Sequence, residues 1–142
     1  MARFFTLKEL CESSTAKARS IDNYPTFEVA AHLSELTEKI LDPLRFAWGS
    51  PIRVNSGYRC RLLNTAVGGA ERSAHMDGYA ADLSAMNGKT EELISFAMEW
   101  IDHGGRKYDQ IIREKRGNST WLHIGLYGPN RIQRCQKLDI IK

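Results

Sequence analysis

Apolar residues recur at three- and four-residue steps in two long stretches of the chain, and this spacing predicts two amphipathic helices. The first spans about residues 26 to 48, and Pro43 is expected to kink it or to end its regular hydrogen bonding early. The second spans about residues 89 to 103, where Gly104-Gly105 ends it. The predicted buried faces carry Val29, Leu33, Leu36, Ile40 and Leu44 in the first helix, and Leu93, Phe96, Ala97, Trp100 and Ile101 in the second.

Shorter apolar segments, bounded by glycine, proline or asparagine, predict a small set of strands. They lie at about residues 52–56, 79–83, 108–114 and 120–127, and residues 115–119 form a five-residue hairpin loop between the last two. Two short helices are expected at 5–10 and 59–66, an irregular surface loop at 13–25 and an edge strand in the tail at 131–141. The predicted fold class is α+β: one domain over residues 1–142, with helices packed on one face of a small, mostly antiparallel sheet.

Composition and charge narrow the function classes. The chain is 42% hydrophobic and 26% charged, as is usual for a globular protein, and its net charge of +3 is too mild for a dedicated nucleic-acid binder. Its three cysteines are widely spaced and form no CxxC pair, so neither a disulfide framework nor a cysteine metal site is expected. No apolar run has the length of a signal peptide or a membrane span. We therefore expect synthesis in the cytoplasm without a signal peptide, no nucleic-acid partner, and a monomer by default.

Three side chains suggest a metal site. His75 lies in a glycine-containing loop, Asp82 lies on the strand after it, and His123 lies on the second strand of the predicted hairpin. Two imidazoles and one carboxylate suit zinc, and three protein ligands leave a fourth position for water, as in catalytic zinc sites. On residue types alone, the alternative is that the three side chains never meet.

The residues around these candidate ligands resemble a known family. Ser73-x-His75-x-x-Gly78-x-Ala80-x-Asp82, followed by Trp121-x-His123, is similar to the motifs of the zinc D-Ala-D-Ala metallopeptidases. That family includes D,D-carboxypeptidases, the D-Ala-D-Ala dipeptidases of vancomycin resistance and phage L-alanyl-D-glutamate endolysins, and the hedgehog signalling domain shares its fold. The stretches 55–59, 63–69 and 108–112 also resemble small members, so the resemblance covers roughly residues 5 to 135.

The resemblance implies a hedgehog-like fold and a zinc ion held by His75, Asp82 and His123. It implies hydrolysis of amide bonds in peptidoglycan stem peptides by a zinc-activated water, of the D,D-carboxypeptidase or endolysin type. Arg59 matches the family arginine that stabilises the charge of the tetrahedral intermediate and contacts substrate, and Ser73 matches a substrate-binding position. The expected site of action is the bacterial cell wall, after a phage-type release. The alternative is a non-catalytic, zinc-stabilised binding module of the same fold.

The general base is the point at which the chain departs from its relatives. Several of them place an acid three positions before the last histidine, where this chain has Thr120, which cannot accept a proton at neutral pH. Glu114 is the favoured replacement, Asp109 the second and Asp77 a distant third. A five-residue hairpin loop would place Glu114 opposite Thr120, on the face away from His123. A one-residue bulge would bring Glu114 round to the metal, and the sequence leaves both possibilities open.

Overall fold

The computed structural model describes residues 3–142, which form a five-stranded sheet in the order β1-β2-β4-β3-β5. All neighbouring strands are antiparallel except β3 and β5, which are parallel. The predicted α+β class with a mostly antiparallel sheet is therefore confirmed, and the tail supplies an edge strand. The strands are β1 (Ile52–Ser56), β2 (Ala80–Ala85), β3 (Gln110–Arg116), β4 (Ser119–Gly125) and β5 (Gln136–Ile141).

The long predicted helix consists of three consecutive segments, α3 (Phe27–Leu36), η1 (Thr37–Leu41) and α4 (Asp42–Trp48). The middle segment is a π-helical turn, in which the Asp42 N–H bonds the Thr37 carbonyl five residues back. Pro43 directly follows this turn and has no N–H to continue a regular ladder, so the wider turn accommodates it without ending the helix. The other helices are α1 (Leu7–Cys11), α2 (Ser14–Ala18), α5 (Arg61–Ala66), η2 (Ala74–Asp77), α6 (Thr90–Trp100), η3 (His103–Gly105) and η4 (Pro129–Arg131).

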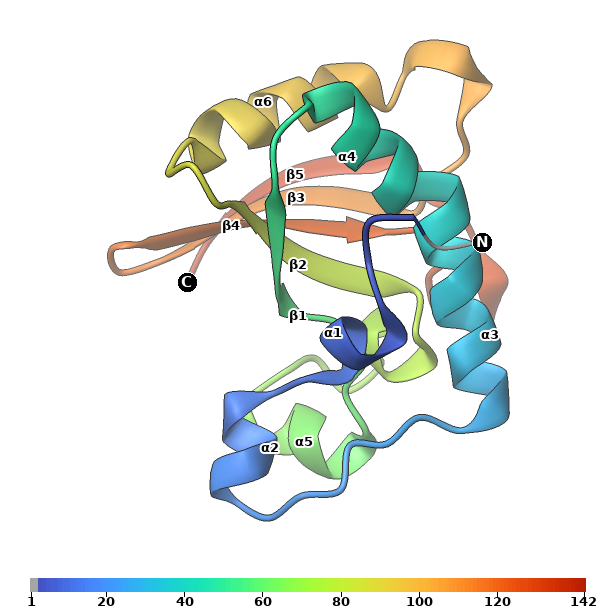
Figure 1. The fold of residues 1–142 in the computed structure, drawn as a ribbon, viewed down its shortest axis with the longest axis vertical. Coiled ribbons are helices and arrows are strands. Elements are labelled where there is room, and N and C mark those ends of the chain that lie inside the picture. The colour runs from blue at the N-terminus through green and yellow to red at the C-terminus, as the bar shows by residue number, and fades with distance from the viewer. Residues whose placement is uncertain (1–2) are drawn as a thin grey trace.

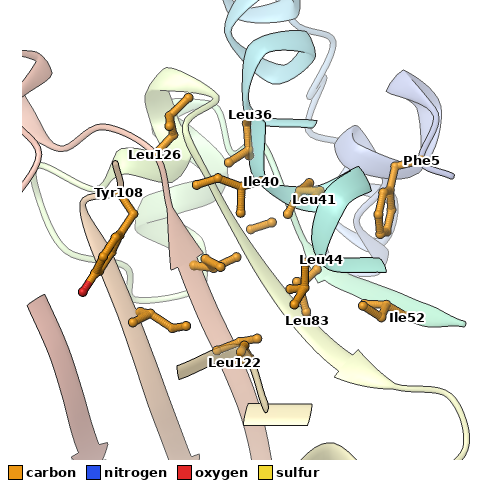
Figure 2. Packing of buried hydrophobic residues seen from close by; sticks show 14 of the residues in the cluster. Phe5, Leu36, Ile40, Leu41, Leu44, Ile52, Leu83, Tyr108, Leu122 and Leu126 are labelled. Carbon is orange, nitrogen blue, oxygen red and sulfur yellow. The ribbon is translucent and has the colours of Figure 1, made fainter. Parts of the chain in front are cut away.

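The hydrophobic core lies between one face of the sheet and the helices α3, α4 and α6 (Figure 1). Figure 2 shows Leu36, Ile40 and Leu44 of the helical stretch gathered over Leu83 and Leu122 of the sheet, and all five are fully buried. Because side chains alternate along a strand, the residues next to Leu83 and Leu122 in sequence face the other side of the sheet. That second face is where the candidate chemistry lies. Among the helices of residues 3–142, none combines the length and apolar content that crossing a lipid bilayer requires.

Two local expectations are wrong. The stretch 13–25 is not irregular throughout, because it contains α2, which Ser13 caps by accepting the Ala16 N–H at 3.1 Å. The hairpin loop has two residues and not five, since the β3–β4 ladder continues to the pair Arg116 and Ser119. Its first loop residue is Gly117 with a φ of +60°, a conformation that glycine adopts readily and that tight hairpin turns require.

Candidate metal centre

The side chains of His75, Asp82 and His123 meet on the face of the sheet that points away from the hydrophobic core. Asp82 Oδ1 lies 3.2 Å from His75 Nε2 and 3.1 Å from His123 Nδ1. One potential ligand atom from each residue lies within 4.8 Å of the others. The structure thus brings together the three residues that the sequence singled out, in an arrangement that offers two nitrogen ligands and one oxygen ligand to a single ion.

Regular secondary structure places two of these side chains and a short helical turn places the third. Asp82 on β2 and His123 on β4 are directly paired in the antiparallel ladder, so their side chains share a face. His75 lies on η2, where Ser73 Oγ accepts the His75 N–H at 3.1 Å. Gly78 ends η2 with a φ of +78°, and a Cβ there would lie 3.0 Å from Val29, so both the backbone conformation and the tight space favour glycine.

A backbone carbonyl determines the tautomer of His75. Its Nδ1 lies 2.7 Å from the Gly57 carbonyl oxygen, which can only accept, so Nδ1 carries the proton. The lone pair of neutral Nε2 then faces the carboxylate oxygen of Asp82 at 3.2 Å. Two lone pairs at that distance repel unless a cation lies between them. The donor set therefore fits a metal ion, and zinc suits two imidazoles with one carboxylate.

The electrostatics keep the cluster in the protonation state that a metal needs. Burial lowers the pKa of His75, and this effect outweighs the opposing attraction of Asp82. Burial by itself would raise the pKa of Asp82, but the positive charge that a protonated imidazole carries, together with a hydrogen bond donated by His123, holds it well below its usual range. Neutral imidazole and ionised carboxylate are the ligand forms that bind a divalent cation.

The cluster opens into a cleft of about 650 Å³ that Arg59, Ser73, Glu114 and Trp121 also line. The Arg59 Nη2 donates to Ser73 Oγ at 3.3 Å, and the Arg59 backbone N–H donates to the His75 carbonyl at 3.1 Å. Burial lowers the pKa of Arg59, and the nearby charges of Asp82 and Glu114 partly offset this. The arginine predicted to act on substrate is therefore a half-buried cation beside the candidate metal ligands.

Glu114 lies in the cleft on the same face as His123. In the observed register Glu114 is paired with Trp121, and Ile112 with His123, so the expected pairing of Glu114 with Thr120 is wrong by one residue. The two-residue turn causes this shift. The Glu114 carboxylate is buried, and its Oε2 accepts the indole N–H of Trp121 at 2.6 Å. An acid thus lines the same cleft as the candidate metal ligands, although Thr120 is not one.

The other two acids considered as general bases are placed elsewhere. The Asp109 carboxylate is 1% exposed, and the Arg134 guanidinium binds both of its oxygens at 2.7 Å. That pair anchors the segment before β5. Arg134 lines the cleft, whereas Asp109 does not. Asp77 is exposed and does not line the cleft either. Of these three acids, only Glu114 lines the cleft.

The sequence interpretation missed the contribution of the tail. Leu138, Ile140 and Lys142 line the cleft, and Lys142 Nζ lies 3.1 Å from Glu114 Oε1. The available signal was their alternation at every second position, which places all three side chains on one face of an edge strand. This alternation covers too few residues to show beside which strand the tail would pair.

Comparison with known proteins is consistent with this geometry. Residues 3–124 match the family model described as Peptidase M15. A segment of 46 residues is 52% identical to the zinc D-Ala-D-Ala carboxypeptidase of Streptomyces albus G. That segment is 32% of this chain and 18% of the Streptomyces protein, so the alignment covers only a small part of the curated relative.

Proposed function

This chain belongs to the peptidase M15 family, and from that premise we propose that it cuts amide bonds in the stem peptides of bacterial peptidoglycan. It is a zinc peptidase of the M15 type, and the zinc carboxypeptidase relative supports D-Ala-D-Ala as the first bond to test. The observation that carries the proposal is the convergence of His75, Asp82 and His123 at the floor of a cleft that also holds Glu114 and Arg59.

His75, Asp82 and His123 would hold the zinc ion. Zinc supplies Lewis-acid chemistry, in that it acidifies a bound water and polarises the scissile carbonyl. Glu114 would act as the general base, accepting the proton of the attacking water on a carboxylate oxygen and returning it to the leaving amine. Arg59 would stabilise the negative charge that develops on the carbonyl oxygen, because a half-buried guanidinium acts more strongly there than an exposed one.

The cleft walls support a peptide substrate that carries free carboxylates. Besides Arg59, the cationic side chains of Arg72 and Arg116 line the cleft, and Ser73 offers a hydroxyl beside Arg59. Stem peptides of peptidoglycan present such carboxylates. Either a carboxypeptidase or an endolysin-type endopeptidase is compatible with these walls. In both cases the proposed place of action is the cell wall.

A non-catalytic binding module of the same fold is the alternative that Thr120 favoured. Glu114 weakens that argument, because it offers an acid to the cleft from the neighbouring strand. A peptidase releases a cleaved product from its substrate, whereas a binding module releases none, so an assay of product release separates the two.

The test uses purified peptidoglycan and a synthetic stem pentapeptide ending in D-Ala-D-Ala. We expect product release that a chelator abolishes and that added zinc restores. His75→Ala, Asp82→Ala and His123→Ala should each lose bound zinc and activity, whereas Glu114→Gln should keep zinc and lose turnover by roughly 10²- to 10⁴-fold. Stoichiometric zinc in all three ligand variants would refute the metal assignment. Zinc binding without metal-dependent release from either substrate would instead favour the module.

A further inference from the structure

The segment after residue 124 builds one wall of the active-site cleft. The family match ends at residue 124, so β5 and Lys142 lie beyond it. Nevertheless Leu138, Ile140 and Lys142 line the cleft, because β5 runs parallel to β3 and pairs Ile140 with Glu114. The residues of this wall therefore lie outside the part of the chain that the family model matches, and their role has to be inferred from this structure.

Lys142 is held so that its ammonium group reaches Glu114. The Lys142 backbone N–H donates to the Lys115 carbonyl at 2.7 Å, which continues the parallel pairing by one residue. From this anchor, Lys142 Nζ lies 3.1 Å from Glu114 Oε1 and 6.0 Å from the centre of the Trp121 ring. The ammonium group thus contacts the carboxylate from the β5 side of the cleft.

The two oxygens of Glu114 are engaged from different strands. Oε2 accepts the Trp121 indole N–H at 2.6 Å from β4, while Oε1 faces Lys142 at the end of β5. A carboxylate with one partner can rotate about its last torsion, whereas donors on both oxygens fix its plane. Each oxygen keeps a further lone pair, so neither contact prevents the carboxylate from accepting a proton from water.

We propose that Lys142 is a positioning residue: its ammonium group holds the carboxylate of Glu114, the proposed general base, in the plane that proton transfer requires. This proposal rests on the proposed role of Glu114. It makes the end of β5 part of the catalytic apparatus. Removing the ammonium would leave Oε1 of this buried carboxylate without its charged donor, while the neutral indole N–H of Trp121 would still bind Oε2.

The decisive variant is Lys142→Met, which keeps the length of the side chain and removes its charge. Lys137→Met is a matched control, because Lys137 lies on β5, the strand that Lys142 directly follows. Lys137 is similarly exposed and pairs its ammonium with the exposed Asp102 at 2.5 Å, away from the cleft. With the stem pentapeptide, we expect kcat to fall about 10-fold in Lys142→Met with KM changed less than about twofold. Lys137→Met should match the wild type, and Lys142→Arg should recover most of the loss.

A second readout does not depend on turnover. In ¹⁵N-labelled protein, with and without zinc, the indole N–H resonance of Trp121 reports its hydrogen bond to Glu114. This resonance, assigned with Trp121→Phe, should move in Lys142→Met and stay in place in Lys137→Met. An unmoved resonance overturns the proposal whether or not the enzyme is active. A rise in KM at constant kcat also overturns it, since Lys142 would then bind substrate.

The outcomes separate this proposal from the one on which it rests. An inactive Glu114→Gln together with a fully active Lys142→Met refutes the role of Lys142 alone. A fully active Glu114→Gln refutes the role of Glu114 as base, and the role of Lys142 with it. Absence of zinc-dependent release by the wild type contradicts the proposed function, and the indole resonance then still decides whether Lys142 positions Glu114.

Discussion

Gly57 offers a sharp test of how the backbone supports the metal centre, because its carbonyl accepts the Nδ1 proton of His75 at 2.7 Å. A Cβ built on Gly57 would lie 2.1 Å from the Leu10 carbonyl oxygen and 2.9 Å from the Leu10 carbonyl carbon. Both are backbone atoms, so no side-chain rotation relieves the contact. In Gly57→Ala, residues 10 and 57 must separate by more than 1 Å to reach an ordinary contact of about 3.4 Å.

Two hydrogen bonds depend on this close approach. The Tyr58 N–H donates to the Leu10 carbonyl at 2.8 Å, and the Gly57 carbonyl orients His75. Overpacking costs about 1–3 kcal/mol and each weakened hydrogen bond about 1 kcal/mol, so we expect the free energy of unfolding to fall by roughly 3 kcal/mol. For a chain of this length that lowers Tm by roughly 10 °C. Misorienting His75 should also weaken zinc binding by about 10- to 100-fold.

The assay is thermal unfolding of the metal-free protein by circular dichroism, followed by zinc titration against a chromophoric chelator. Unfolding without metal matters because bound zinc would add its own stabilisation to the measured Tm. The control is Gly88→Ala. Gly88 has a φ of +82°, but a Cβ built there would meet no atom within 4 Å, so only backbone strain of about 1 kcal/mol is expected, with unchanged zinc affinity. If Gly57→Ala matched the wild type in both Tm and zinc affinity, the argument from the Gly57–Leu10 contact would be wrong.

Three further substitutions test the framework around the cleft. Arg134→Met leaves the buried Asp109 carboxylate without its bidentate partner, and unfolding by denaturant should show a loss of about 3 kcal/mol; an unchanged midpoint would mean that the pair contributes nothing. Hydrogen bonding from Lys39 is the largest effect that lowers the pKa of Glu35 in the folded protein. The stabilisation that the ionised Glu35 gives the fold is therefore present above pH 4.5 and is lost as the pH falls further. Glu35→Gln should therefore destabilise the protein by about 1 kcal/mol at pH 7, and the gap from wild type should close in acid. The Asn23 side chain links three backbone groups: its amide N–H donates to the carbonyls of residues 11 and 58, and its oxygen accepts the N–H of residue 60. Asn23→Ala should therefore lower the free energy of unfolding by about 2–3 kcal/mol in the same denaturant assay, and a change below about 1 kcal/mol would contradict this.

The hairpin before His123 shows where local sequence signals were sufficient and where they were misjudged. The apolar alternation predicted both strands, and Gly117-Asn118 is a known signal for a two-residue turn. Treating residues 115–119 as the loop shortened the ladder and changed the register by one. In a strand a shift of one residue exchanges the two faces, so this small error moved Glu114 from the metal side to the opposite side.

Local patterns account for the features that depend on neighbouring residues. The helical periodicity at 26–48 and 89–103, the strand alternation and the spacing of His75 and Asp82 all follow from residues a few positions apart, and the structure contains these elements. The motif around His75 also identified the peptidase family, to which the chain belongs.

Contacts between distant segments required the folded chain. Nothing near Asp109 in sequence indicates that Arg134 occupies its carboxylate, and nothing near Lys142 indicates that its ammonium reaches Glu114. Both contacts depend on β5 adding to β3 in parallel, a pairing between segments about 26 residues apart that has no local pattern. The residue types were readable from the chain, whereas the face of the sheet on which Glu114 lies, and the position of Asp109 outside the cleft lining, followed from strand register and packing.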